Sequence, residues 1–236
     1  LVMIDVEDYR IKKAEMVFMS LSGGADSAIL FYHACDVMPD KTFLVWSGSD
    51  IGRPNLKEAK AVYNFVKEKY PKVNILPHHT FEYSVRKYPQ TIDQTKTEWD
   101  PKKDPKSIFH RQEELKLKIV HEPDLCLNGM TSHPPEEAIK EFKLDVDEGH
   151  GILEKRRQKT RSPWGQNMTP SGKHVHYYSP FMQKDKSHVK DMYVKYGVLD
   201  TLFPLTASCI GWPDKVTLPC KVCVWCKERL WAFGTY

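Results

Sequence analysis

Hydrophobic residues along this chain fall into short apolar runs that alternate with amphipathic segments. Four runs have the length of buried strands, and the first of them ends in a glycine turn. These runs cover residues 15–21, 41–46, 73–76 and 125–128. Four other segments place apolar side chains at helical spacing. These segments cover residues 27–37, 56–70, 107–120 and 187–196.

Strands that alternate with helices predict an α/β fold, with a parallel sheet and helices on both of its faces. Ligands of such sheets bind at the carboxyl ends of the strands. Three loops are expected at that edge, namely residues 22–27, 47–53 and 128–135. We expect one domain over residues 1–236.

The region 145–178 breaks the pattern, because it is rich in Gly, Pro, Lys and Arg and shows neither helical nor strand periodicity. Loops of this length are uncommon inside a compact domain and typically serve as lids or binding loops, or are disordered. We therefore expect an insertion here. Its basic run 155–161 is either a solvated loop or a docking site for RNA, DNA or a protein terminus.

The first apolar run leads directly into the sequence Ser22-Gly23-Gly24-Ala25-Asp26-Ser27. The two glycines allow positive φ and a close approach of the backbone to a ligand, and the two serines supply hydroxyl groups. The helix expected next directs free N–H groups and the positive end of its dipole at the same space. These features predict a phosphate or pyrophosphate site. The Walker pattern is absent, and the alternative is an ordinary glycine turn with an Asp N-cap.

Four of the six cysteines crowd near the end of the sequence, at Cys209, Cys220, Cys223 and Cys226. Cysteines two residues apart can converge on one ion, and a complete set of four thiolates predicts a structural zinc site in the tail 205–236. The alternatives are a set of buried free thiols, a redox C-x-x-C pair, an iron–sulfur cluster and a zinc-ribbon nucleic-acid module. Clustered rather than evenly spread cysteines are typical of metal binding in a reducing compartment, so we expect a cytoplasmic protein.

The net charge of +4 suits an anionic substrate such as a nucleotide and does not demand a nucleic-acid partner. No stretch approaches the roughly 18 apolar residues of a membrane span, and residues 1–13 lack the apolar centre of a signal peptide. We expect no membrane partner. A homodimer is compatible with the sequence, which leaves the oligomeric state open.

The motif S-G-G-x-D-S after a first strand resembles the signature of the PP-loop ATP pyrophosphatases, whose fold is Rossmann-like and of the adenine nucleotide alpha hydrolase type. The resemblance implies that ATP binds here with Mg²⁺, which prefers oxygen ligands, and that pyrophosphate is released. It assigns the phosphates to Ser22, Gly23, Gly24, Asp26 and Ser27, and counts Leu21 among the residues that bind ATP. It also implies that Asp26 and Ser27 are catalytic and that the adenine rests near Ser47.

A second resemblance lies in the segments Ser179–Lys186, Lys195–Val198 and Thr206–Cys209, whose order is similar to that of the 7-cyano-7-deazaguanine synthases. The resemblance covers the beginning and end of the chain well and the middle poorly. It implies a ligase of queuosine biosynthesis that makes the nitrile from 7-carboxy-7-deazaguanine and ammonia through an adenylate, with release of AMP and pyrophosphate. Lys186 would contact a phosphate or the leaving group, or would be a solvated lysine at a helix start.

The same resemblance implies substrate contacts from the loop after the fourth apolar run, by Asn128, Gly129, Thr131 and His133. Arg111 would bind ATP or substrate, or would form a surface ion pair with Glu114. The family's Y-P-D-C-R segment is replaced by Pro134-Pro135-Glu136-Glu137, which is typical of the first turn of a helix.

Two other functions compete with this one. A PP-loop sulfurtransferase or an adenylyl-sulfate reductase would need a reactive thiol, but Cys35 and Cys126 lie in apolar surroundings and are expected to be inert. A divergent member of the superfamily that modifies a nucleic acid or a protein would use the basic run 155–161.

Overall fold

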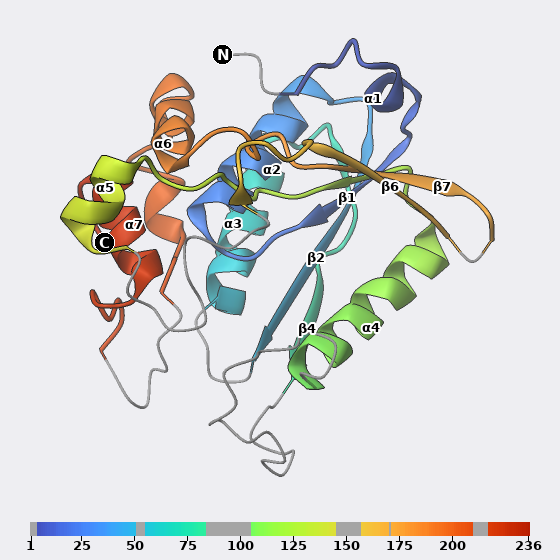
Figure 1. The fold of residues 1–236 in the computed structure, drawn as a ribbon. Helices are drawn as coiled ribbons and strands as arrows, with labels where there is room; N and C mark the ends of the chain where they lie inside the picture. Colours follow the sequence, from blue (N-terminus) through green and yellow to red (C-terminus); the bar gives the residue numbers. More distant parts are fainter. Residues whose placement is uncertain (1–3, 51–54, 84–104, 145–156, 170, 210–216) are drawn as a thin grey trace.

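The structure, a computed structural model, describes residues 4–50, 55–83, 105–144, 157–169, 171–209 and 217–236. Strands and helices alternate through the first two thirds of the chain (Figure 1). The strands are β1 Met16–Ser20, β2 Thr42–Asp50, β3 Asn74–Ile75, β4 His79–Tyr83, β5 Leu125–Leu127, β6 Trp164–Met168 and β7 His174–Tyr178. The helices are α1 Tyr9–Lys13, α2 Ala25–Val37, α3 Asn55–Lys69, α4 Pro105–His121, α5 Glu136–Phe142, α6 Lys186–Lys195 and α7 Val224–Phe233, with a 3₁₀ turn, η3, at Phe203–Leu205.

The described strands form one sheet in the order β3-β2-β1-β5-β7-β6, and β4 also pairs with β2. All pairings are parallel except that of β6 with β7. This sheet is the expected α/β architecture of Rossmann type, mostly parallel and with one antiparallel edge strand.

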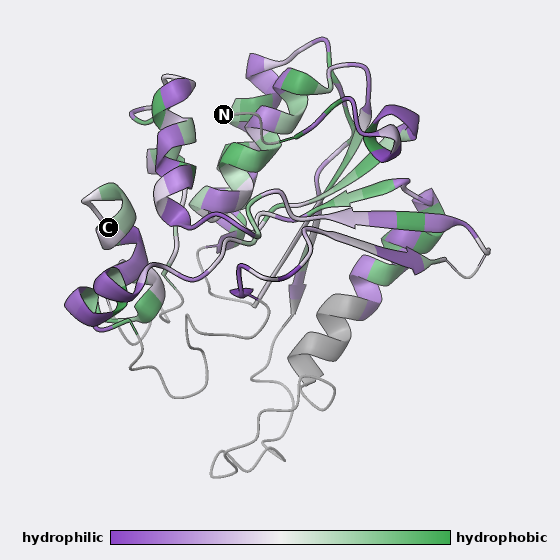
Figure 2. Ribbon diagram, turned by 45° about the horizontal axis from the view of Figure 1, so that its top comes forward, coloured by the Kyte–Doolittle hydropathy of each residue, from purple (hydrophilic) through white to green (hydrophobic). Residues whose placement is uncertain are grey.

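Alternate residues of each central strand face opposite sides of the sheet, as strand geometry requires. In β1, Val17 and Met19 join a large core with α2, α3, α6 and α7, whereas Phe18 faces a smaller cluster that includes Leu117 of α4. Helices therefore cover both faces. Figure 2 shows the hydrophobic colour concentrated in α2 and along the strands that it covers.

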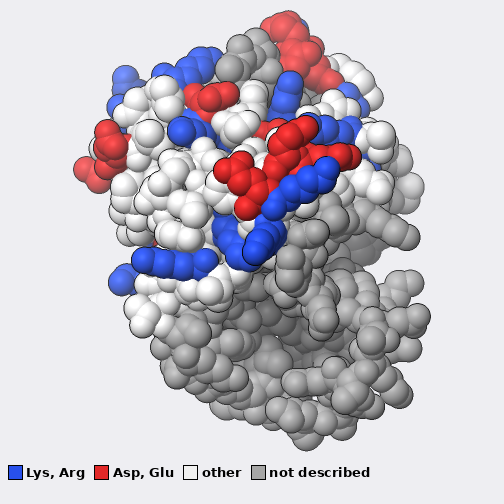
Figure 3. All heavy atoms as spheres, turned by 60° about the vertical axis from the view of Figure 1, so that its left-hand side comes forward, with Lys and Arg blue, Asp and Glu red and all other residues white. Residues whose placement is uncertain are grey.

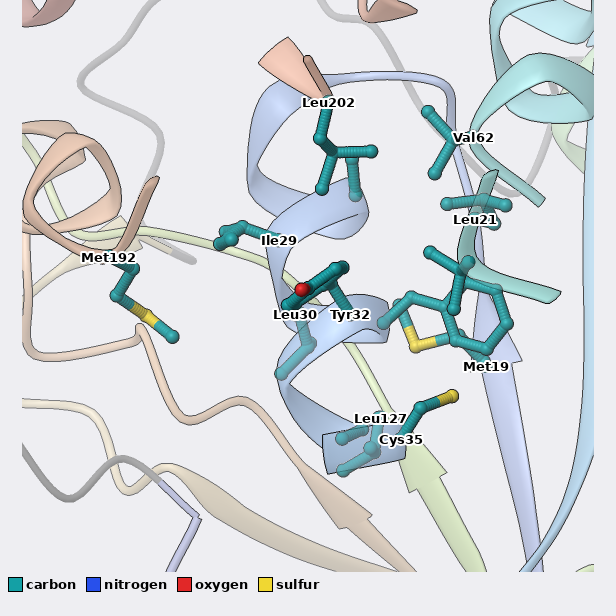
Figure 4. Close-up of a cluster of buried hydrophobic side chains, with 14 of the residues drawn as sticks. Met19, Leu21, Ile29, Leu30, Tyr32, Cys35, Val62, Leu127, Met192 and Leu202 are labelled. Atoms are coloured by element: carbon teal, nitrogen blue, oxygen red, sulfur yellow. The ribbon is translucent and has the colours of Figure 1, made fainter. Parts of the chain in front are cut away.

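Helix α2 is buried on nearly all sides, because β1, α3 and α6 surround it. Figure 4 shows its side chains Ile29, Leu30 and Cys35 among residues of the sheet and of neighbouring helices. All three are fully buried. The helix that follows the glycine turn is thus the central element of the core, and its N-terminus is held rigidly at the end of β1.

Three sequence expectations about this architecture are wrong. The region 145–178 was expected to lack strands, but its described part contains β6 and β7, and β7 pairs with β5 inside the sheet. Residues 47–50 were expected to be a loop but belong to β2, where they pair with β4. Strand β4 itself was not anticipated. The segments 51–54 and 145–156 lie outside the described residues.

Candidate phosphate site and cysteine cluster

The loop between β1 and α2 lies at the carboxyl end of the central strand, where α/β sheets bind ligands. Gly23 adopts φ +79°, and a Cβ there would lie 2.3 Å from the carbonyl oxygen of Asn55 in α3. Only glycine fits this position. Gly24 was also expected to use positive φ, but it is extended, at φ −83° and ψ 160°, and is the N-cap of α2.

The first turn of α2 is not capped by a side chain. The backbone N–H groups of Ala25, Asp26 and Ser27 have no acceptor within the described part of the chain. Two other loop amides contact serine hydroxyls, since Ser22 N donates to Ser27 Oγ at 3.2 Å and Gly24 N to Ser22 Oγ at 3.3 Å. Helix N-termini with free amides attract anions, so this end of α2 is suited to a phosphate.

Gly129 brings the loop after β5 against the same helix end. A Cβ on Gly129 would lie 2.8 Å from Ser27 N and 2.9 Å from the carbonyl carbon of Asp26. The predicted substrate loop is therefore packed directly beside the phosphate loop. The side chain of Asn128 is exposed, and its Oδ1 accepts from Met130 N at 2.8 Å.

Ser47 also reaches the phosphate loop, from the end of β2. Its hydroxyl is buried, donates to the carbonyl oxygen of Leu21 at 2.5 Å and lies 2.7 Å from His78 Nε2. Burial lowers the pKa of His78 to about 4, and its Nδ1 has no hydrogen-bond partner among the described residues. Ser47 thus joins β2 to the loop, and its predicted contact with adenine stays a prediction.

Four charged side chains form a continuous network behind the loop. Lys186 Nζ lies 3.3 Å from Asp26 Oδ2 and 3.0 Å from Glu228 Oε2. Arg157 Nη2 donates to Glu228 Oε1 at 2.5 Å. The side chains of Lys186, Glu228 and Arg157 are 4%, 0% and 3% exposed, whereas that of Asp26 is 23% exposed. Asp26 is therefore the member of the network that solvent or a ligand can reach.

Mutual attraction favours the charged forms of Glu228 and Lys186. Burial alone would raise the pKa of Glu228, but Lys186 and Arg157 outweigh it and hold this pKa below its ordinary value. Burial alone would lower the pKa of Lys186, but Asp26 and Glu228 raise it. Burial raises the pKa of Asp26 against the attraction of Lys186, and Asp26 Oδ1 has no hydrogen-bond partner within the described chain.

The burial of Lys186 and Arg157 corrects two readings of the sequence. Lys186 is not a solvated lysine at a helix start, since it is 3% exposed. Arg157, part of the basic run 155–161, is neither solvated nor available for docking. Its Nε donates to the Thr131 carbonyl at 3.1 Å, and its Nη2 to Thr131 Oγ1 at 3.0 Å and to the Ser132 carbonyl at 2.8 Å.

The loop 129–133 is consequently held in place by Arg157 and by the segment that precedes α6. Ser132 N donates to the Lys184 carbonyl at 2.8 Å, and His133 N to the Arg157 carbonyl at 3.0 Å. The Thr131 side chain is buried against Arg157, and His133 is half-buried. Substrate contacts by these two residues stay predictions.

Helix α7 holds a third segment against the phosphate loop. Arg229 Nη1 donates to Thr206 Oγ1 at 2.8 Å, and its guanidinium lies 3.9 Å from the ring centre of Phe203. Ala207 N then donates to the Gly23 carbonyl at 2.9 Å. Neither Glu228 nor Arg229 was expected from the sequence. The available signal was the run of three charged residues, 227–229, inside an otherwise apolar helix, with Val224, Glu228 and Ala232 on one face.

The four C-terminal cysteines come together as expected. Their sulfur atoms all lie within 4.8 Å of one another, and Cys220 Sγ is 3.9 Å from Cys226 Sγ. Four thiolates at such distances can hold a metal ion. Cys223 is the N-cap of α7 and Cys226 lies in its first turn, so the cluster sits at the start of the helix that carries Glu228.

The other two cysteines lie in the apolar core, as the sequence predicts. Cys35 and Cys126 are buried, and burial raises the pKa of both thiols, that of Cys126 to about 12. At that pKa, a thiol has almost no thiolate at neutral pH and is a poor nucleophile.

Arg111 lies on α4, the helix that covers the opposite face of the sheet from α2, and its side chain is outside the described residues. Its proposed partner Glu114 forms an ion pair with Lys118 at 2.5 Å. The part of Arg111 in ATP binding stays a prediction.

The outer surface around α5, α6 and α7 shows basic and acidic side chains side by side among the described residues (Figure 3). A continuous field of positive charge, as nucleic-acid binding would favour, is not seen on the described part of this face. None of the helices in the described part of the chain combines the length and the apolar character needed to cross a bilayer.

The chain matches no protein-family model and no curated protein sequence. Among solved structures, it is similar to the U34-tRNA thiolase NcsA from Methanococcus maripaludis with its [4Fe-4S] cluster, at 15% identity and a TM-score of 0.42 over 78% of this chain. It spans 56% of that protein. It is also similar to the NMN synthetase from Francisella tularensis, at 13% identity and a TM-score of 0.41, over 95% of this chain and 79% of the other. Similarity at this level carries no information on the ligand of this chain.

Proposed function

We propose that this chain is an ATP-using enzyme of the PP-loop class, which activates an oxygen of its substrate as the adenylate and releases pyrophosphate. The proposal depends mainly on the first turn of α2, which no side chain caps. This turn follows the central strand β1 and the loop residue Gly23, whose φ is positive. The phosphates would accept from the amides of Ala25, Asp26 and Ser27. These amides would stabilise the charge that develops on the leaving pyrophosphate.

Asp26 is the residue best placed to act beside the phosphates. Its carboxylate is held by Lys186 on one side, and Oδ1 is shielded from solvent and lacks a partner within the described chain. Buried polar atoms without partners in a native fold call for an explanation, and a ligand contact is one. Mg²⁺ bound with ATP would neutralise phosphate charge, and a carboxylate oxygen such as that of Asp26 is a ligand it accepts.

For the substrate, we propose 7-carboxy-7-deazaguanine, in agreement with the sequence resemblance. The carboxylate would attack the α-phosphorus of ATP, which forms an acyl adenylate and expels pyrophosphate. Ammonia would displace AMP to give the amide. A second ATP would adenylate the amide oxygen and expel a second pyrophosphate, and loss of AMP and of both amide N–H protons would leave the nitrile. The loop 128–133 supports this proposal, because Gly129 places it beside the loop where ATP would bind.

The metal of the cysteine cluster is proposed to be a structural zinc. A tetrahedral ion binds four thiolates at about 2.3 Å, which brings the sulfur atoms close together. In a [4Fe–4S] cluster, each thiolate binds a different iron, so the sulfur atoms stand farther apart. The mutual distances within 4.8 Å in this chain favour a single ion. A complete set of four ligands leaves no position for substrate, so the ion would stabilise α7 rather than take part in the reaction.

Sulfur transfer is less well supported. All six cysteines are described, two of them are buried with raised thiol pKa, and the other four form the cluster. A sulfurtransferase would need either a free thiolate or a cluster that carries sulfur. Iron in the purified protein would therefore revive this alternative.

The function is tested by incubation with Mg-ATP, ammonium and 7-carboxy-7-deazaguanine, with AMP, pyrophosphate and the nitrile followed by mass spectrometry. We expect all three products from the wild type and from Asp200→Asn, whose side chain is exposed, and none from Asp26→Asn. Pyrophosphate release with a different acid, but not with this one, would refute the substrate and leave the ATP chemistry intact. Equal pyrophosphate release by Asp26→Asn would refute the assigned site.

A further inference from the structure

Glu228 lies between the cysteine cluster and the phosphate loop, and its contacts connect the two. It follows Cys226 by two residues on α7, its side chain is 0% exposed, and each of its carboxylate oxygens meets a different cation. A carboxylate buried this deeply is costly unless its partners hold it in place. Its position therefore depends on α7, whose N-cap is Cys223 and whose first turn contains Cys226.

One route leads from Glu228 to the phosphate loop through Lys186. The ammonium group lies 3.0 Å from Glu228 Oε2 and 3.3 Å from Asp26 Oδ2, so the same three-donor group connects both carboxylates. Asp26 is in the first turn of α2. A shift of Glu228 would move Lys186, and the orientation of the Asp26 carboxylate would change with it.

A second route leads to the same helix end through Arg157. Its guanidinium binds Glu228 Oε1 and the carbonyl groups of Thr131 and Ser132. These residues continue from Gly129, which packs on the Asp26–Ser27 peptide. Two independent sets of contacts thus run from one carboxylate to the N-terminus of α2.

We propose that Glu228 is a positioning residue that couples the cysteine cluster to the phosphate loop, so that order at the metal site sets the geometry of the residues that hold ATP. The proposal rests on the proposed function for its effect on turnover. The coupling itself is a property of the folded chain and can be measured without nucleotide.

The variant Glu228→Gln distinguishes an effect of Glu228 on the geometry of the phosphate loop from an effect of its charge alone. Glutamine has nearly the same shape and can still accept from Arg157, but it cannot balance two cations. The variant adds one net positive charge near a site for a polyanion, so a purely electrostatic role predicts tighter binding of ATP and unchanged kcat. A positioning role predicts at least a tenfold fall in kcat for pyrophosphate release, at wild-type metal content.

The matched control is Glu137→Gln, which removes an exposed glutamate from α5, a helix that packs against α7. Hydrogen exchange of the metal-loaded proteins is followed by mass spectrometry on peptides that cover residues 20–30 and 127–134, with metal content determined by elemental analysis. We expect at least tenfold faster exchange in both peptides for Glu228→Gln, and wild-type exchange for Glu137→Gln. Wild-type exchange in Glu228→Gln would overturn the proposal.

If Glu228→Gln does not fold, Glu228→Gln combined with Arg157→Gln removes one charge of each sign and restores the balance of the network. The same fast exchange at residues 20–30 is expected from this double variant, and wild-type exchange there would again overturn the proposal. A wild type that neither binds ATP nor releases pyrophosphate would refute the proposed function, while the exchange measurement would still decide whether Glu228 couples the two sites.

Discussion

Gly23→Ala gives the sharpest test of the loop geometry, because a second glycine supplies an internal control. Gly23 and Gly197 both have positive φ, +79° and +64°, so alanine is strained at either position. A Cβ at Gly197 would meet nothing within 4 Å, whereas one at Gly23 would lie 2.3 Å from the Asn55 carbonyl oxygen and 3.0 Å from Ala59 N. The two variants therefore share the backbone strain and differ in the clash with α3.

The expected magnitudes follow from these contacts. Left-handed backbone costs an alanine about 1–2 kcal/mol, so Gly197→Ala should lower the free energy of unfolding by that amount. Gly23→Ala adds an overlap with backbone atoms that cannot rotate away, and overpacking of this kind costs a further 1–3 kcal/mol or so. We expect Gly23→Ala to lower the free energy of unfolding by about 2–5 kcal/mol in total.

Urea denaturation followed by circular dichroism measures both values under identical conditions. Pyrophosphate release should be lost in Gly23→Ala, because the loop must move away from α3, and retained in Gly197→Ala. Equal losses of stability within about 0.5 kcal/mol would refute the reasoning, since such a difference is no larger than ordinary surface effects.

Three further predictions concern the metal cluster, the buried network and acid stability. Cys223→Ser should lose the bound metal and several kcal/mol of unfolding free energy, because metal binding contributes directly to folding. Cys35→Ser, outside the cluster, should bind as much metal as the wild type, and elemental analysis measures the metal content of both variants. Arg157→Met should cost about 3–5 kcal/mol in urea denaturation, since it leaves Oε1 of the buried Glu228 without its cation and only Lys186 to balance two carboxylates. The exposed Arg161→Met should stay within about 0.5 kcal/mol, and equal effects of the two variants would contradict the network. Burial lowers the pKa of His33 to about 4 from 6.5, so the unfolded chain binds its proton first and stability falls as the pH drops through this interval. The loss of unfolding free energy attributable to His33 is about 3 kcal/mol. In thermal melts at a series of pH values, the stability of His33→Gln should therefore fall less steeply with decreasing pH than that of the wild type. An equally steep fall in both proteins would disprove the role of His33.

Much of the fold could be predicted because its strands are buried on both faces and read as continuous apolar runs. β1, β2, β3 and β5 and the helices α2, α3, α4 and α6 lie within a few residues of their expected positions. The turn at Gly23 was equally readable, since the glycines and serines that form it are adjacent in the sequence.

The missed strands lack such a signal. β6 has the sequence WGQNM and is mostly exposed at the sheet edge, and β7 alternates histidine with valine and tyrosine. Their strand conformation comes from pairing with each other and with β5, which is a long-range contact. Local pattern alone could not separate them from the polar sequence around them.

The buried network was beyond prediction for a related reason. Glu228 and Arg157 are 71 residues apart, and each looks like an ordinary surface charge in its own segment. Arg157 was read with its basic neighbours as a solvated or docking residue. Its burial follows from how α7 packs beside α6, and that contact is set by the tertiary fold.

The central claim is that the amide groups between Leu21 and Ala28 receive the phosphates of ATP. Titration of the ¹⁵N-labelled protein with Mg-ATP tests it directly through the backbone amide resonances. We predict saturable shifts that are largest for Ala25, Asp26 and Ser27 and that are absent in Asp26→Asn at the same nucleotide concentration. Unshifted resonances for these three residues at saturating Mg-ATP would contradict the account.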